Sequence, residues 1–106
     1  MQINTGNETH EVKGTRTLTT TGDETHTNKA DFTHQVSGNF VLKVSGNLTL
    51  DVTGEVLIKS GQSLTNKAGQ NLTNQAGATL TNKASASQTV DGGGMLILKG
   101  GLVKIN

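Results

Sequence analysis

The sequence predicts an all-β fold in which three identical chains intertwine as a homotrimeric parallel β-helix, a triangular prism built from octapeptide repeats. Three observations lead to this prediction. Glycines recur every eight residues, apolar and polar residues alternate, and the chain is too poor in apolar residues to form a core alone. Of its 106 residues, 31% are hydrophobic, and they include two Phe but no Trp or Tyr.

Glycine marks the eight-residue period, and we expect it at corners of the backbone where its conformational freedom is useful. Ala30 fills the one gap in the first series, and a seven-residue step then indicates that one residue is deleted and the corner moves by one position. The sequence therefore predicts a shaft over residues 1–90, with a glycine phase change near 61, and a tip segment over residues 91–106. The series are Gly6, Gly14, Gly22, Gly38, Gly46, Gly54 and then Gly61, Gly69, Gly77.

The alternation decides between strand and helix. Between residues 5 and 92, 22 apolar residues (Ala, Val, Ile, Leu, Phe) have even numbers, and Val41 and Leu57 alone have odd numbers. A period of two is typical of a strand with one buried face. Of the 17 charged residues, 13 have odd numbers, so the odd-numbered side chains are expected to face water.

Residues 1–90 contain no Asn-Gly or Asp-Gly pair, so consecutive octads are not expected to fold back as hairpins. A chain that advances by short strands and corners is a β-solenoid or one thread of an intertwined one. One chain alone would leave open sheet edges at both ends, whereas three interleaved chains pair their strands with one another. This favours two further copies of the chain as partners.

The repeated unit Val-x-Gly, followed by alternating residues, resembles the octapeptide of the central spike of contractile-tail phages and of VgrG, the spike of type VI secretion systems. It occurs at Val12-Lys13-Gly14, Val36-Ser37-Gly38, Val44-Ser45-Gly46 and Val52-Thr53-Gly54, and the ending GGGMLILKGGLVKIN also resembles the close of VgrG chains. Ala30 and the phase change at 61 depart from the pattern.

This resemblance implies a structural needle, not an enzyme, that punctures a cell envelope as the C-terminal part of a longer spike. It also implies assembly in the bacterial cytoplasm, delivery by the type VI apparatus to the outside or to a target cell, and a PAAR-repeat protein seated on the C-terminal end. The start of the sequence does not resemble a signal peptide.

Two sets of even-numbered polar residues are expected to face the threefold axis. Three copies of one histidine could ligate a metal, and rings of amides could hold one another, water or an unidentified ion. The spacing of the histidines favours hydrogen-bonded structural roles, so no cofactor or metal is assigned. The sets are His10, His26, His34 and Asn66, Asn74, Asn82.

The tip segment has apolar residues of both parities, which indicates a second covered face. The alternatives are a slightly apolar end of the trimer and a platform on which the tip protein docks. The candidate docking residues are Leu102, Val103, Lys104, Ile105 and Asn106.

Other classes of protein fit less well. A net charge of +1 with almost no aromatic residues argues against nucleic-acid binding. The many threonines lack a positioned base, so catalysis is not expected. Two alternatives share the repeat: the stalk of a trimeric adhesin, and an ice-binding or surface-binding β-solenoid suggested by runs such as Thr15-Arg16-Thr17.

Overall fold

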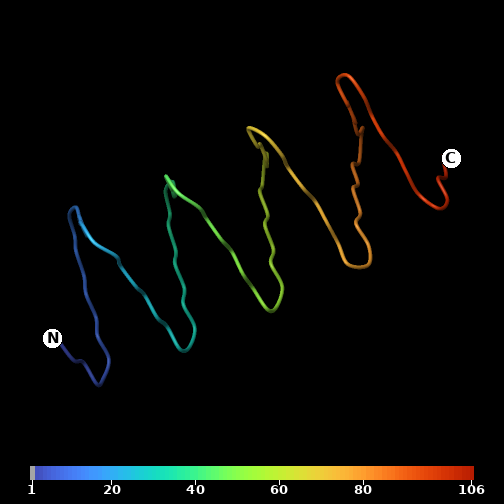
Figure 1. Cartoon of the computed structure of the whole chain (residues 1–106). Helices are drawn as coiled ribbons and strands as arrows, with labels where there is room; N and C mark the ends of the chain where they lie inside the picture. The colour runs from blue at the N-terminus through green and yellow to red at the C-terminus, as the bar shows by residue number, and fades with distance from the viewer. Residues whose placement is uncertain (1) are drawn as a thin grey trace. The chain divides into compact units, whose positions relative to one another are not determined.

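The computed structural model describes residues 2–106, and Met1, with which the predicted shaft begins, lies outside the described residues. The chain divides into two units, Met1–Asp51 and Val52–Asn106. Residues 2–106 form neither helices nor hydrogen-bonded β-strands, and instead consist of extended segments joined by bends (Figure 1). No helix among the described residues has the length and hydropathy needed to cross a membrane.

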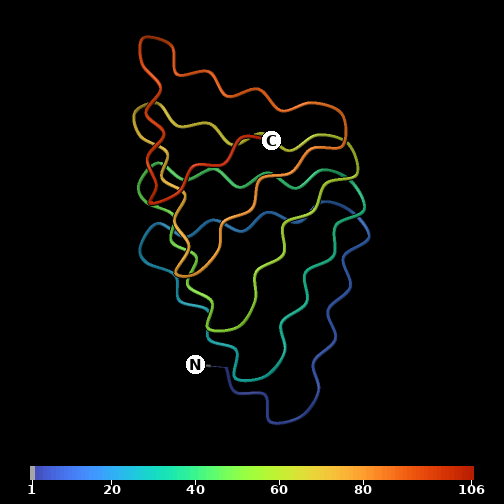
Figure 2. The same ribbon diagram turned by 90° about the vertical axis from the view of Figure 1, so that its right-hand side faces the viewer.

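The bends recur every eight residues without exception from residues 13–14 to residues 101–102. We therefore number each octad from 1 to 8 so that its bend occupies positions 7 and 8, as in octads 7–14, 15–22 and so on to 95–102. Six-residue extended segments separate successive bends, and Figure 2 shows them as pleated traces that meet at sharp turns. The predicted octad of a short strand plus a corner is thus present as a local conformation.

The expectation that a corner moves near residue 61 is wrong. The bend at residues 53–54 is followed by one at residues 61–62, so the eight-residue spacing is kept and no residue is deleted. The glycine instead changes its place within the bend, from position 8 in Gly54 to position 7 in Gly61. Because the spacing is unbroken, positions 2, 4 and 6 are even-numbered throughout, which explains why the apolar face survives the glycine phase change.

At several bends the side chain of the residue at position 6 forms hydrogen bonds with backbone groups of the bend. In the bend at residues 29–30, which lacks glycine, the Asn28 Oδ1 accepts a hydrogen bond from the Ala30 N–H at 3.1 Å, and its Nδ2 donates to the Asp31 carbonyl at 3.0 Å. Ser60 does the same where the glycine changes its place: its Oγ accepts from the Gln62 N–H at 3.3 Å and donates to the Ser63 carbonyl at 2.8 Å. Such side-chain bonds to nearby backbone groups stabilise turns.

The bend at residues 93–94 is a tighter turn than the others. The Met95 N–H donates to the Gly92 carbonyl at 3.2 Å, and the Gly93 N–H donates to the Asp91 Oδ1 at 2.9 Å. Gly93 has a φ of 65°, the one positive φ among the described residues. Glycine at the first central position of such a turn relieves the strain that a side chain would meet. The predicted tip segment therefore begins at a distinctive turn.

Unit 2 winds in repeated turns. In Figure 1 its trace reaches its lower edge in the yellow-green, orange and red parts, which the colour bar places near the bends at 53–54, 77–78 and 101–102. These bends are three octads apart, so three octads make one turn. Within either unit, no two described residues twelve or more positions apart have Cα atoms within 8 Å. Successive turns of one chain are therefore farther apart than the ~4.8 Å that separates paired strands.

The chain by itself buries no side chain among the described residues. It exposes 12396 Å², whereas a compact protein of this length exposes ~5,600 Å². The sequence predicts paired strands, but a strand requires a neighbour with which to exchange backbone hydrogen bonds. The separation between successive turns explains why extended segments form here without a ladder.

Candidate functional site

We call the octad numbering that is set by the bends the bend frame. In this frame all six predicted axial residues occupy one position of the octad. His10, His26 and His34 stand at position 4 in unit 1, and the three asparagines stand at position 4 in unit 2. This common position was not evident from the glycine series, because the assumed deletion separated the two sets. The six residues are Asn66, Asn74, Asn82 and the three histidines.

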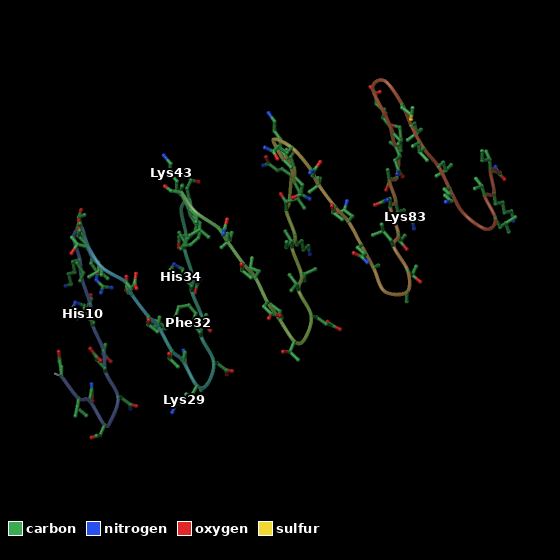
Figure 3. The ribbon with its side chains drawn as sticks, viewed as in Figure 1. His10, Lys29, Phe32, His34, Lys43 and Lys83 are labelled. Carbon is green, nitrogen blue, oxygen red and sulfur yellow. The ribbon has the colours of Figure 1, made fainter. Side chains whose placement is uncertain are left out.

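Two of the histidines contact the chain's two phenylalanines. The His26 and Phe32 rings meet edge to face with centroids 5.2 Å apart, and His34 and Phe40 do so at 5.1 Å. Phe32 and His34 lie on the same extended segment, with centroids 6.4 Å apart and planes tilted by 41° (Figure 3). The four residues form a continuous aromatic row that crosses the bends at 29–30 and 37–38.

The phenylalanines occupy position 2, and the residues before and after them at that position differ in chemistry. Glu8, Arg16 and Glu24 precede Phe32, so position 2 begins with charged side chains. After Phe40, position 2 carries aliphatic side chains from Leu48 to Leu80. Sequence reasoning identified the histidines but missed the aromatic row. The signal was the placement of both phenylalanines six residues after a histidine.

The asparagine set is not brought together within one chain. No hydrogen bond joins Asn66, Asn74 and Asn82 to one another in the part of the chain that the structure describes. No group of three His, Cys, Asp or Glu side chains within residues 2–106 is arranged to hold a metal ion. The predicted rings at the threefold axis would draw their members from three chains, so they stay predictions.

Lysines project away from the backbone from both bends and extended segments. Figure 3 shows this for Lys29, which lies in a bend, and for Lys43 and Lys83, which lie in extended segments. Lys43 and Lys83 both occupy position 5 of their octads, on the odd-numbered face. The expectation that charged side chains lie opposite a buried apolar face stays a prediction, because every described residue of the single chain is exposed.

The predicted docking residues lie in and after the last bend. Leu102 belongs to that bend and Ile105 lies beyond it, and their side chains are 86% and 85% exposed. Val103 is less open at 47%. Leu102 and Ile105 differ in parity, so the end of the chain carries exposed apolar residues at both even-numbered and odd-numbered positions. Their role as a docking platform stays a prediction, together with Lys104 and Asn106.

Residues 6–27 match the family described as the Gp5 C-terminal repeat, in three copies. These repeats form part of a β-helix spike, so the match supports a β-helical, structural role like that of a phage tail spike. It covers the first octads of the shaft, including His10, Arg16 and Glu24. No curated protein and no solved structure matches the chain.

Proposed function

We propose that this chain forms a homotrimeric β-helical needle that punctures a cell envelope as part of a contractile injection machine. The observation that carries the proposal is the spacing of the bends, which stays at eight residues from 13–14 to 101–102. An uninterrupted period is what a rod requires, since each layer then repeats the geometry of the last. The spike-type repeat at residues 6–27 supports the same structural role.

The separation between turns supports three chains. A prism of three interleaved chains places two strands of other copies between successive turns of each chain, which spaces those turns by about 14 Å at the usual strand separation. The absence of Cα atoms within 8 Å between distant residues of either unit is consistent with that spacing. Two further copies would cover the even-numbered face and complete every backbone ladder.

The machine that we propose is the type VI secretion system, with this chain serving as the needle of a VgrG-like spike. The basis is the resemblance of the Val-x-Gly octads and of the ending GGGMLILKGGLVKIN to those proteins. In this role the chain does no chemistry. Force delivered along the trimer is resisted by interchain hydrogen bonds, and the polar odd-numbered exterior lets the needle pass through the envelope.

Sedimentation equilibrium of the purified chain tests the trimer. We expect a single species of three chains at micromolar concentration, with a circular dichroism spectrum dominated by β-structure. A monomer under those conditions would overturn the needle, because one chain buries no side chain among its described residues.

Capture of a PAAR-repeat protein tests the tip. We expect the trimer to retain such a protein and to lose it when residues 102–106 are deleted, since Leu102 and Ile105 provide the exposed apolar surface at the end. A charge-neutralising change on the shaft, Lys43→Gln, serves as the control and should leave capture unchanged. Equal capture by the intact and shortened trimers would contradict the platform and favour a stalk without a docking tip.

A further inference from the structure

We infer that the aromatic row, His26, Phe32, His34 and Phe40, binds the same row of two further copies and sets the register in which the three chains assemble. This inference rests on the proposed trimer and adds the surface that aligns its chains. The partner of the row is the identical surface of another copy.

The shaft needs such an element because part of it cannot distinguish one register from another. In the bend frame, octads 63–70, 71–78 and 79–86 each carry Leu at position 2, Asn at position 4 and Ala at position 6. Sliding one chain by eight residues along its own path therefore leaves the side chains at positions 2, 4 and 6 unchanged wherever these octads overlap. A repetitive strand pattern of this kind specifies register weakly.

The aromatic row does distinguish registers. Its neighbours at position 2 are Glu24 before Phe32 and Leu48 after Phe40. A slip of one octad in one direction places the Phe32 ring of one chain level with the Glu24 carboxylates of the others. Burying a carboxylate against an aromatic ring without a partner is costly, whereas matched chains bring ring against ring. Only the matched register keeps all the rings together.

The geometry of the single chain leaves the row ready for such contacts. The Phe32 and Phe40 side chains are 61% and 62% exposed although each already meets a histidine ring. A shallow hollow beside the row is lined by His34, Val36 and Phe40. Edge-to-face contacts across two successive bends hold the four rings in a fixed order, so each copy presents the same sequence of rings to the next.

A disulfide that forms only between slipped chains tests the inference. The chain has no cysteine, so two versions, Ala68→Cys and Ala84→Cys with tags of different size, can be assembled together and oxidised. In the matched register these positions are two strands apart, about 9.6 Å. That exceeds the ~7 Å between Cα atoms that a disulfide allows. A slip of one octad brings them onto adjacent strands.

We expect little mixed disulfide in the otherwise unchanged trimer and a several-fold increase when both chains carry Phe32→Leu and Phe40→Leu. Leucine keeps the position apolar, as at Leu48, so assembly should persist while the register relaxes. Leu48→Ala, a change at the same octad position outside the row, is the control and should leave the mixed disulfide at its low level. If the double variant fails to assemble, Phe32→Leu alone gives the same comparison.

The outcomes separate this inference from the proposed function. A trimer with Phe32→Leu and Phe40→Leu that forms no more mixed disulfide than the unchanged trimer would overturn the role of the row and leave the needle standing. An increase of the same size with Leu48→Ala would also overturn it, because any loss of apolar surface would then relax the register. Failure of the unchanged chain to form a trimer in sedimentation would overturn the needle itself.

Discussion

At the residue scale, Asn28 illustrates how a bend forms where the repeat lacks glycine. Lys29 and Ala30 occupy the two bend positions, and Asn28 uses both ends of its amide on the backbone around them. Asparagine is suited to this because one side chain supplies an acceptor and two donors. The departure from the glycine pattern at residue 30 is thus compensated two residues earlier.

Replacing Asn28 by Ala should destabilise the assembled protein by about 1 kcal/mol per chain, because two side-chain hydrogen bonds to the bend are lost. Urea unfolding at a fixed protein concentration measures the change. The control is Thr20→Ala, at the same octad position one octad earlier, in a bend that contains Gly22. The control should cost less than about 0.5 kcal/mol. Equal losses in the two variants would show that Asn28 does not close its bend.

At the scale of the element, the octad itself was predictable from the sequence. Alternation gave the extended segments and the even-numbered apolar face, and the glycines gave the eight-residue period. The position of the corner after residue 54 was not predictable, because glycine is acceptable at either bend position and its shift from Gly54 to Gly61 mimics a deletion. The apolar residues after the phase change, Leu64, Leu72 and Leu80, are still even-numbered. Their parity indicated that the eight-residue spacing of the bends is unbroken.

The candidate site was predictable in part for a similar reason. Parity alone selected the histidines and asparagines as inward residues, and the bend frame places them at the same octad position. The contacts of His26 and His34 with Phe32 and Phe40 depend on how the chain turns at 29–30 and 37–38. The number of residues between two side chains does not give the angle between the extended segments on either side of a bend. The turn at Gly93 likewise depends on a backbone angle rather than on a repeat.

At the scale of the whole molecule, the proposed trimer would supply the stability that a single chain lacks. Among the described residues no side chain is buried, and the single backbone hydrogen bond joins the Met95 N–H to the Gly92 carbonyl. Ordering the backbone costs roughly 1–2 kcal/mol per residue in conformational entropy. A lone chain with so few contacts cannot offset that cost. In the proposed trimer, association would supply both missing contributions, because it would cover the even-numbered face and pair the extended segments. Folding and trimer formation are therefore expected to be one process.

The thermal midpoint of unfolding should consequently rise with protein concentration, since mass action favours the folded trimer over three unfolded chains. Circular dichroism melting curves over a hundredfold range of concentration measure this, with complete refolding on cooling as the condition for comparing them. The N28A variant should show a lower midpoint at every concentration but the same dependence, because its bend lies within one chain. A midpoint that does not change with concentration would mean that each chain is stable alone. That result would contradict the interleaved prism, because a stable lone chain would have to bury its own even-numbered face.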